Sequence, residues 1–498
     1  MSAWTHAAIC AALGIGTDAD ADGAVYTGIS TDTRSLEKGQ VFVALVGENH
    51  DAHTYLQQAA DAGAAAAVVH RIPDDAPDSL HYYVVEDTLR ALGRLGRFHR
   101  RRMGWTVVAV AGANGKTTTK DLLRAALSQK YQVHATTGNL NNLIGAPLTL
   151  LAAPAGTEVV VAEVGTNTPG EVARLAGIVE PDHAVITSIA AEHLEGLGDL
   201  DGVLREETSI LPWLSGHGLA VVPDDPPSLA ARARALVSRV VVVGSGNDAD
   251  AAYRAANVRL DADGAVRFDW QGLTVSVQLR GRHNARNALL ALAVASELGV
   301  DTDGAIAAMA QLAPAKMRGE FLRFGQLTVI ADCYNANPAS VQAAIDLLVS
   351  LPRGGGRVAV LGTMRELGEQ SARLHEETAA EVASSDVDLI VATGDFVAAF
   401  DAYAERLGDR LIRAEDPLEA YERFAGRLRG DETVLLKGSR GVALERLLPR
   451  FEETWGVLHP HGEAFGSRAI DTITDVRDDA SSAEHPRTTT NAPEGGKA

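Results

Sequence analysis

One stretch of this sequence, VVAVAGANGKTTTK at residues 107–120, constrains the fold more than any other part of the chain. Its first five residues are apolar and rich in valine, which predicts a buried strand. Apolar residues then recur at helical spacing, which predicts an amphipathic helix; they are Leu122, Leu123, Ala126 and Leu127. The glycine-containing loop between them therefore joins a strand to the N-terminus of a helix.

The residue types in this loop are those that bind phosphate groups. Glycines allow backbone N–H groups to curl around phosphate oxygens, the helix dipole favours an anion, and Lys116 adds a mobile cation. Thr117 offers a hydroxyl to Mg²⁺. The common pattern has a glycine at position 110, where this chain has Val110. The strand–loop–helix context still favours an ATP-type nucleotide site over a glycine-rich turn with a solvated lysine. The predicted nucleotide-binding residues here are Gly112, Ala113, Asn114, Gly115, Lys116, Thr117 and Thr118.

Strands and helices alternate along most of the chain. Apolar runs that predict strands follow the loop at TEVVVAEVG, DHAVITSI, GLAVVP and RVVVVG, with helical segments between them. Such alternation predicts right-handed βαβ crossovers and a mainly parallel sheet. A hairpin-like stretch then precedes the helical HNARNALLALAVASELG. A further α/β unit begins near Ala315, with predicted strands at LTVIADC, GRVAVLG, DLIVATG and ETVLLKG.

The predicted fold class is α/β, with three domains. A length of 498 residues at roughly 150 residues per domain agrees with that number. The first domain, 1–103, mixes short strands and helices, and its stretch 53–70 predicts a helix that runs through Gly63 into a strand. The second spans 104–314 and the third 315–455. The polar tail 456–498 is predicted to be disordered.

Composition excludes several classes of protein. The net charge of −20 is spread along the chain, which indicates a solvated acidic surface and argues against a nucleic-acid-binding face. The sequence contains no uninterrupted apolar run of 18 residues, so it predicts no membrane span. The N-terminus also lacks the basic region of an export signal. Cys10 and Cys333 are too few for a disulfide framework. We therefore expect a cytoplasmic protein.

Acidic and imidazole side chains follow two of the predicted strands. The strand VVVAE delivers Glu163 to the carboxyl edge of the sheet, where α/β proteins form ligand sites. The next strand leads into AAEHLEG, which carries His193. A carboxylate suits Mg²⁺, whereas a lone histidine is more often an ordinary surface or core residue. Its place after the second strand makes His193 a candidate ligand, while Glu192 and Glu195 are expected to be solvated or to lie behind the ligands.

These segments together resemble the Mur ligase family, which joins amino acids or dipeptides to UDP-linked muramoyl precursors. GANGKTT is similar to that family's own phosphate loop, and AEVGTNTPGE and ITSIAAEHLEG are similar to its metal-binding stretches. The resemblance covers about residues 25 to 450. It implies a UDP-muramoyl-peptide-binding first domain, a central P-loop ATPase-like domain and a Rossmann-like C-terminal domain for acceptor and nucleotide. It also implies nucleotide contacts from both later domains, at Asn284, Asn287, Arg318, Asp332 and Tyr334.

Three stretches are most similar to the family branch whose acceptor is D-alanyl-D-alanine. They are TTGNLNNLIGAPLTLL, ADCYNANPAS, and LGTMRELG with His375 beyond it. The N-terminal STDTRSLEKGQVFVALVGENHDAH is similar to the segment that binds the UDP precursor. Ala331 and Thr363 stand where the family often has acids, which affects only the expected dipeptide contacts. The substrate-binding residues that the resemblance implies are Asp32, Thr33, Arg34, Phe42, Asn139, Asn142, Asn335, Asn337, Pro338 and His375.

One departure from the family concerns a lysine that carries a carbamate and binds a second Mg²⁺. This chain has no lysine between Lys130 and Lys316, and the matching position holds Glu207. Our hypothesis is that Glu207, or Glu206 if the register shifts by one, supplies the anionic oxygen directly. The alternative is an ordinary glutamate on a helix surface. The catalytic set that follows is Lys116, Glu163, His193 and Glu207, and the metal set is Thr117, Glu163, His193 and Glu207.

The resemblance implies a ligase that uses ATP and Mg²⁺ to join UDP-N-acetylmuramoyl-tripeptide to D-alanyl-D-alanine through an acyl phosphate. It also implies a monomer and closure of the domains around the substrates. Two alternatives stay open within the family: a ligase for another amino acid, such as diaminopimelate or lysine, and one that adds glutamate to folate. A third alternative is a nucleotide-binding scaffold that has lost catalysis, which the missing lysine alone favours.

Overall fold

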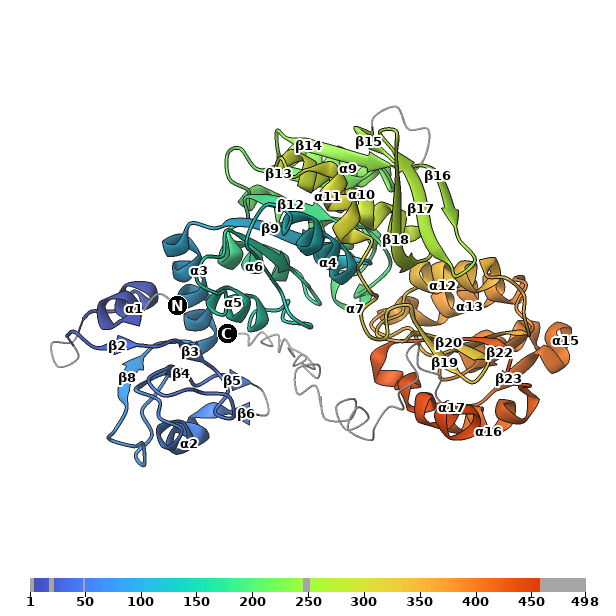
Figure 1. The fold of residues 1–498 in the computed structure, drawn as a ribbon. Helices are drawn as coiled ribbons and strands as arrows, with labels where there is room; N and C mark the ends of the chain where they lie inside the picture. The colour runs from blue at the N-terminus through green and yellow to red at the C-terminus, as the bar shows by residue number, and fades with distance from the viewer. Residues whose placement is uncertain (1–3, 18–21, 48–49, 245–250, 457–498) are drawn as a thin grey trace, which may run out of the picture.

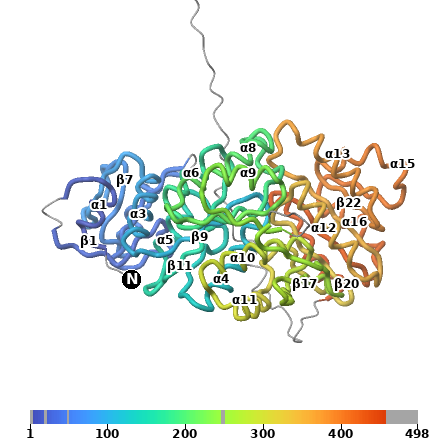
Figure 2. Tube along the Cα trace, turned by 90° about the horizontal axis from the view of Figure 1, so that it is seen from above, coloured from blue at the N-terminus to red at the C-terminus, as the bar shows by residue number. Residues whose placement is uncertain are grey.

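The computed structural model of this chain describes residues 4–17, 22–47, 50–244 and 251–456. The predicted tail therefore lies outside the described residues, except for Gly456. The chain forms an N-terminal unit, a central unit and a C-terminal unit, and the first and last lie at opposite ends of the central one (Figures 1 and 2). None of the helices in the described ranges has the length and apolar character that a membrane span requires.

The N-terminal unit is built on a four-stranded parallel sheet with strand order β3-β4-β7-β8. The prediction that a helix runs through Gly63 is wrong: helix α2 ends at Asp61, and Gly63 adopts a φ of 93°, which a continuing helix does not allow. The strands of this unit are β1 (Trp4–Thr5), β2 (Val25–Tyr26), β3 (Ile29–Ser30), β4 (Val41–Val43), β5 (Val46–Gly47), β6 (His50–Asp51), β7 (Ala66–Val69) and β8 (His81–Val84). Its helices are α1 (His6–Leu13), α2 (Leu56–Asp61) and α3 (Thr88–Met103).

Helix α3 connects the N-terminal unit to the central one. Asp87 caps its N-terminus by accepting from the N–H groups of Leu89 and Arg90, and Gly104 ends it in the left-handed conformation. Its basic last turns face the central unit, where the Arg100 guanidinium donates to the Asp182 carboxylate at 2.7 Å. These contacts fix the helix across the junction.

The central unit contains a seven-stranded, all-parallel sheet, as the alternation of apolar runs and helices predicts. The strand order is β10-β11-β9-β12-β13-β14-β15, and helices cover both faces. The strands are β9 (Thr106–Ala111), β10 (Val133–Ala135), β11 (Val159–Glu163), β12 (His183–Ile186), β13 (Leu219–Pro223), β14 (Val240–Gly244) and β15 (Tyr253–Arg254). The helices are α4 (Lys116–Leu127), α5 (Gly145–Leu151), α6 (Glu171–Val179), α7 (Leu194–Leu197), α8 (Leu200–Thr208), α9 (Pro227–Leu236), α10 (His283–Glu297) and α11 (Thr302–Met309).

The middle strand β9 is apolar throughout because both of its faces are buried. Val108 and Val110 belong to the core beneath α4 and α10, whereas Val107 and Ala109 belong to the core on the opposite face. A strand buried on both faces needs apolar residues at consecutive positions. The stretch predicted to be hairpin-like is antiparallel, and it forms a sheet of three strands: β16 (Ala256–Leu260), β17 (Ala265–Trp270) and β18 (Leu273–Arg280).

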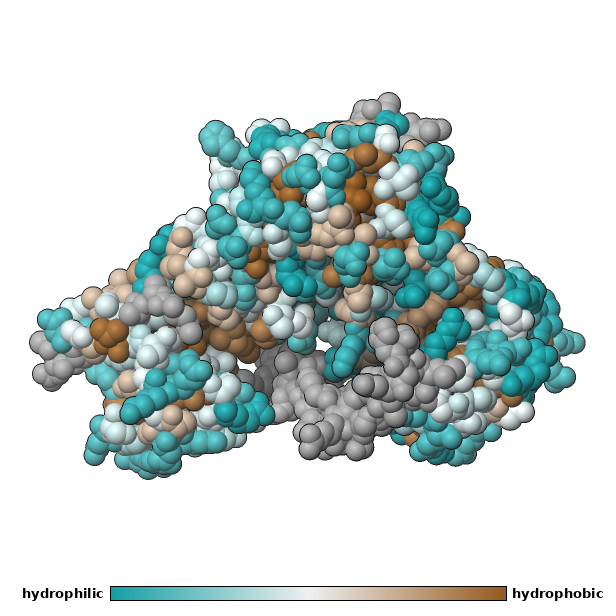
Figure 3. All heavy atoms as spheres, viewed as in Figure 1, coloured by the Kyte–Doolittle hydropathy of each residue, from teal (hydrophilic) through white to brown (hydrophobic). Residues whose placement is uncertain are grey.

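The C-terminal unit has a six-stranded sheet with order β19-β20-β24-β21-β22-β23, in which only the β19–β20 pair is antiparallel. Helices again form cores on both faces. Its strands are β19 (Glu320–Phe324), β20 (Leu327–Asp332), β21 (Arg357–Leu361), β22 (Leu389–Ala392), β23 (Leu411–Arg413) and β24 (Thr433–Lys437). Its helices are α12 (Pro338–Ser350), α13 (Ser371–Ala383), α14 (Phe396–Ala399), α15 (Ala404–Leu407), α16 (Pro417–Phe424) and α17 (Leu448–Trp455). On the face drawn in Figure 3, hydrophobic residues gather in small separate patches within a mostly hydrophilic surface.

Candidate functional site

A cavity of about 1640 Å³ lies between the central and C-terminal units. The loops after β9, β11 and β12 reach it from one side, and the loops after β20 and β24 reach it from the other. In both sheets these are the carboxyl ends of parallel strands, where α/β proteins place their ligands. The volume exceeds that of a usual single-ligand pocket, so the cavity has room for more than one substrate.

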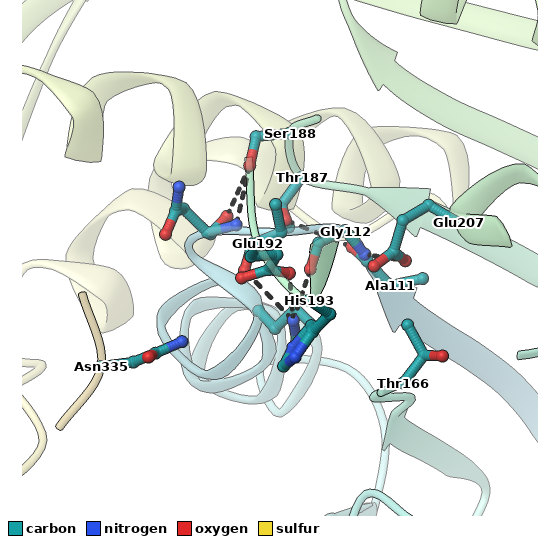
Figure 4. Close-up of polar contacts among 12 residues, drawn as sticks. Ala111, Gly112, Thr166, Thr187, Ser188, Glu192, His193, Glu207 and Asn335 are labelled. Atoms are coloured by element: carbon teal, nitrogen blue, oxygen red, sulfur yellow. Dashed lines mark hydrogen bonds and ion pairs between the residues drawn. The ribbon is translucent and has the colours of Figure 1, made fainter. Parts of the chain in front are cut away.

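The loop between β9 and α4 is held by Glu207 of α8 and by Ser188, which follows β12 (Figure 4). The Gly112 N–H donates to the Glu207 carboxylate at 2.6 Å. The Ala113 N–H donates to the Ser188 carbonyl, and the Asn114 N–H donates to the Ser188 hydroxyl at 2.8 Å. These three N–H groups are therefore engaged by the protein. The expectation that backbone N–H groups of this loop curl around phosphate oxygens does not hold for these three positions, and Gly112 does not line the cavity.

The end of the loop and the first turn of α4 both face the cavity. Gly115 has a φ of 89°, and a Cβ there would lie 2.7 Å from the Asn287 amide oxygen, so both conformation and space require glycine. Lys116, Thr117 and Thr118 follow and line the cavity. Because the first N–H groups of a helix have no partner within it, this turn supplies donors and a favourable dipole to an anion.

Lys116 is held as a cation within the site. Its ammonium donates to the carbonyl oxygens of Gly112 at 2.6 Å and Ala113 at 3.1 Å, and lies 3.5 Å from the Glu192 carboxylate. Burial disfavours the charge, but the carboxylates of Glu192 and Glu207 outweigh it and raise the pKa of Lys116. The lysine therefore carries its positive charge at neutral pH.

Glu163 has the features of a metal ligand. It ends β11, is 2% exposed and lines the cavity. One carboxylate oxygen accepts from the Asn141 amide at 2.9 Å, while the other is buried and has no hydrogen-bond partner among the described residues. An unsatisfied buried carboxylate oxygen is costly, and a hard cation would satisfy it. Thr117, which carries a hydroxyl, lines the same cavity, and these oxygen donors are of the kind that Mg²⁺ prefers.

His193 is the residue just before α7, at its N-cap, and it lines the cavity together with Glu192. Its Nδ1 is hydrogen-bonded to the Glu366 carboxylate, which comes from the C-terminal unit. Burial works against the charged imidazole, but this bond and the charge of Glu192 prevail and raise the pKa of His193. Glu192 is only 4% exposed, so of the two places expected for it, in solvent or behind the ligands, the first is wrong.

The position of Glu207 differs from the one that the hypothesis of a direct metal ligand requires. It is 1% exposed, does not line the cavity, and directs an oxygen at the Gly112 backbone. Desolvation, opposed by Lys116, raises its pKa to about 7. Glu206, the alternative position, accepts from the N–H groups of Gly170 and Val172 and so secures the start of α6. Within the described ranges, no three His, Cys, Asp or Glu side chains are grouped closely enough to hold a metal ion.

The predicted nucleotide-binding residues all line the same cavity, apart from Gly112. Asn287 donates to the Asn284 amide oxygen at 2.9 Å on α10, opposite the phosphate loop. From the C-terminal unit, the Arg318 guanidinium lies 4.0 Å from the centre of the Tyr334 ring. The Asp332 carboxylate lies 3.0 Å from the ammonium group of the buried Lys437. Groups from the two units thus face each other across the cavity.

Apart from His375, the predicted substrate-binding residues of the central and C-terminal units divide into two groups. Asn139, Asn142 and Asn335 line the cavity. Asn337 and Pro338 do not, because they start α12: proline occupies the first helical position, and the Asn337 side chain accepts from the Ser340 N–H. The Asn337 amide also exchanges two hydrogen bonds with Asn114, at 2.9 and 3.2 Å. Asn337 is 1% exposed and acts here as a contact between units.

His375 is a further correction. Its Nε2 accepts from the Met364 N–H at 2.9 Å, and its Nδ1 donates to the Ser371 carbonyl at 2.8 Å. Burial lowers its pKa, so the ring is neutral, which this bonding pattern requires. Because both nitrogens are engaged and the residue is 1% exposed, His375 shapes the loop after β21 and does not face a substrate.

The four predicted substrate residues of the N-terminal unit lie outside this cavity. Asp32 and Arg34 form a side-chain ion pair at 2.8 Å on the surface, with half-buried Thr33 between them. Phe42 lies in β4, is 1% exposed and packs in the core of the unit. This burial argues against direct contact between its side chain and a substrate.

Several cavity residues were not predicted. Asn141 orients Glu163, Glu192 accompanies Lys116, and Glu366 contacts His193. Asn141 lies in the run NLNN between two predicted substrate asparagines, so its neighbours were a usable signal. Glu366 is 173 residues from His193, and no pattern in a single sequence indicates that pairing.

Comparisons with known proteins match most of the chain. The family model described as "Mur ligase middle domain" matches residues 110–295, and the model described as "Mur ligase, glutamate ligase domain" matches residues 317–440. The UDP-N-acetylmuramoyl-tripeptide--D-alanyl-D-alanine ligase of Bacillus subtilis (strain 168) is 35% identical over 432 residues, covering 85% of this chain and 93% of that relative. The protein of the same name from Escherichia coli (strain K12) is 35% identical over 437 residues, with the same two coverages.

Solved structures give the same result. Crystal structure I of MurF from Acinetobacter baumannii aligns with a TM-score of 0.82 and 31% identity, covering 91% of this chain and 100% of that one. MurF ligase from Thermotoga maritima in complex with ADP aligns with a TM-score of 0.73 and 28% identity, covering 86% and 97%.

Proposed function

Because this chain belongs to the Mur ligase family, we propose that it joins D-alanyl-D-alanine to UDP-N-acetylmuramoyl-tripeptide in an ATP-dependent reaction. The observation that carries this function is the similarity, over 93% of their length, to ligases named for that reaction. The cavity supports it, since a phosphate loop and residues of a second nucleotide-facing unit line one space. The product is the UDP-muramoyl-pentapeptide used in peptidoglycan synthesis.

The reaction proceeds in two steps. The terminal carboxylate of the tripeptide attacks the γ-phosphorus of ATP, which releases ADP and forms an acyl phosphate. The dipeptide amine then attacks the acyl carbon, the phosphate leaves with the bonding electrons, and the amine loses a proton. In the first step two anions approach each other, so fixed positive charge at the transferring group contributes most to catalysis.

Lys116 and the first turn of α4 provide that charge. The lysine is a cation whose present partners are two loop carbonyls and the Glu192 carboxylate. We expect its ammonium to exchange the carbonyl oxygens for phosphate oxygens when ATP binds, because both contacts are local and the side chain is flexible. The unsatisfied N–H groups of the same turn complete the phosphate site.

Mg²⁺ is the metal that the donor set suits, with Thr117, Glu163 and His193 as the residues that would hold it. When bound, the ion would neutralise phosphate charge and orient the transferring group. Asn141 holds one Glu163 oxygen and leaves the other for the metal. Glu207 is assigned a different role: it anchors Gly112 and places an anion behind Lys116, while direct ligation of a second metal stays a prediction.

The nucleotide is assigned to residues of both units. Asn284, Asn287 and Tyr334 are assigned to the adenine base, and Arg318 and Asp332 to the rest of the nucleotide. Substrate binding within the cavity is assigned to Asn139, Asn142 and Asn335, which line it. The UDP precursor is assigned to the surface around Asp32, Thr33 and Arg34. We keep three domains, at 1–103, 104–314 and 315–455, as part of this proposal. It is supported by the finding that none of the sheets formed by the described strands crosses these limits. A monomer is the proposed state.

An acceptor comparison tests the function. Phosphate release from ATP is measured with UDP-muramoyl-tripeptide and, in parallel, D-alanyl-D-alanine, single D-alanine, diaminopimelate, lysine or glutamate. We expect release with the dipeptide and rates near background with the single amino acids. Lys116→Ala should lower the rate by at least about a hundredfold with an unchanged circular dichroism spectrum. Release that depends on a single amino acid would replace the assigned acceptor, and release that needs no acceptor would contradict ligase activity.

A further inference from the structure

The loop that contains residues 364–370 of the C-terminal unit is docked on helix α7 of the central unit. The Glu195 N–H donates to the Glu366 carbonyl at 3.1 Å, and the Gln370 amide donates to the Gly198 carbonyl at 2.8 Å. The approach is close, because a Cβ on Gly368 would lie 2.9 Å from the Glu195 Cα. Leu194 and Leu197 of α7 share a core cluster with Met364 and Leu367 of this loop. The contact is therefore a packed interface between units.

Within this interface, the Glu366 carboxylate meets the imidazole of His193. Glu366 accepts at its side-chain oxygen, so Nδ1 of His193 carries the proton of this hydrogen bond. The second nitrogen, Nε2, is then the one that can donate a lone pair. Both side chains line the cavity that contains the phosphate loop. This is the arrangement in which a carboxylate fixes the tautomer and orientation of a metal-binding histidine.

The backbone of His193 shows that its position is imposed by its surroundings. The residue has φ 52° and ψ 29°, the left-handed conformation that non-glycine residues seldom adopt. Such a conformation is unfavourable for a residue with a side chain and persists only where neighbouring structure holds it. The side chain is 14% exposed, and the polar groups that line the cavity beside it include Glu192 and Lys116.

We propose that Glu366 is a positioning residue for His193: it holds the imidazole with Nε2 available to a divalent cation, so that the cation site is complete only while the C-terminal unit is docked on α7. The proposal rests on the proposed function in one respect, the role of His193 as a metal ligand. Binding of the metal and docking of the C-terminal unit stabilise each other, since each favours the same arrangement of His193.

Mn²⁺ binding to the full-length protein tests this without any turnover. Electron paramagnetic resonance measures the Kd of Mn²⁺ in the presence of a non-hydrolysable ATP analogue. Glu366→Ala should weaken Mn²⁺ binding by about ten- to a hundredfold, and Glu366→Gln, which keeps an acceptor oxygen, should weaken it less. Gln370→Ala is the matched control, because it removes a hydrogen bond of the same interface and leaves the His193 pair intact; its Kd should stay within about threefold of wild type.

A double variant separates positioning from direct contact. If Glu366 acts through His193, the variant with both His193→Ala and Glu366→Ala should bind Mn²⁺ as weakly as His193→Ala alone. Additive losses would overturn the proposal, as would an unchanged Kd in Glu366→Ala or an equal loss in Gln370→Ala. Failure of the proposed function is a separate result: a protein that binds Mn²⁺ with this dependence but does not ligate the dipeptide would contradict the function and leave the proposal intact.

Discussion

At the scale of single residues, Glu207 is the side chain whose surroundings differ most from what its position suggests. It is buried behind the phosphate loop, accepts from the Gly112 N–H and lies in the field of Lys116. A buried carboxylate is favoured in its neutral form unless a cation compensates it. Desolvation is the largest influence here, and it raises the pKa of Glu207 to about 7.

This shift predicts a dependence of stability on pH. Because the pKa is higher in the folded protein than in the unfolded chain, the folded state keeps a proton that the unfolded state loses. The contribution of Glu207 is fully present below about pH 4.5 and is lost as the pH rises through about 7, a total of about 3 kcal/mol. Glu207→Gln, which stays neutral, should therefore gain Tm relative to wild type between pH 5 and pH 8, measured without nucleotide or metal. A difference in Tm that does not change with pH would contradict this.

The sequence predicts some of these residues better than others. Lys116, Thr117 and Glu163 could be placed from the sequence because each directly follows a recognisable strand or belongs to one contiguous loop. Asn337 and His375 could not, because an amide or imidazole looks the same in a sequence whether it binds a ligand or a backbone group. Their partners, Asn114 and Met364, become visible only in three dimensions.

At the scale of elements, helix α3 joins the first two units through closely packed glycines. A Cβ on Gly96 would lie 2.7 Å from the Cβ of Pro147 in α5. A Cβ on Gly93, one turn earlier, would lie 3.1 Å from the terminal methyl group of Ile178, which can move. The two glycines thus differ in what a methyl group would meet.

Two matched variants of α3 follow from this difference. Alanine is favoured over glycine inside a helix by up to about 1 kcal/mol. At Gly96 the clash with the Pro147 ring should exceed that gain, so Gly96→Ala should lower the free energy of unfolding by about 1–3 kcal/mol. At Gly93 the two effects nearly cancel, and Gly93→Ala should leave the Tm almost unchanged. Equal Tm values for both variants would mean that α3 does not pack against α5 in this way.

Most elements follow from the sequence, and the exceptions have local causes. The buried strands were predicted because a strand covered on both faces must be apolar at successive positions, as β9 is. The error at α2 arose because its alanine-rich sequence continues past Asp61, whereas the positive φ of Gly63 ends the helix. Helix propensity alone does not reveal such a turn.

At the scale of the whole molecule, contacts between the central and C-terminal units converge on the cavity. Asn114 of the phosphate loop and Asn337 at the start of α12 exchange two hydrogen bonds, and His193 meets Glu366 close by. The phosphate loop is thereby linked directly to the unit that carries Asp332 and Tyr334. Sequence reasoning predicts closure of the domains in general terms, but not which residues touch.

A double-mutant cycle measures the link between Asn114 and Asn337. Asn337→Ala also removes the cap of α12, and the cycle separates that loss from the pairwise contact. Each single variant loses both hydrogen bonds, so the two bonds are counted twice when the losses of the single variants are added. We therefore expect the loss of unfolding free energy in the double variant to be smaller than that sum by about 1–2 kcal/mol. The control pair, Asn114→Ala with Gln370→Ala, should be additive. Additivity in the first pair would show that the two amides are not coupled in solution.

The central claim is that a carboxylate activated by ATP is ligated to a dipeptide in this cavity. The most direct measurement uses UDP-muramoyl-tripeptide with ¹⁸O in the reacting carboxylate, together with ATP, Mg²⁺ and D-alanyl-D-alanine, and weighs both products by mass spectrometry. The account predicts a peptide product heavier by one dipeptide less one water, and one ¹⁸O atom in each released phosphate. Released phosphate without ¹⁸O, or a tripeptide of unchanged mass, would contradict it.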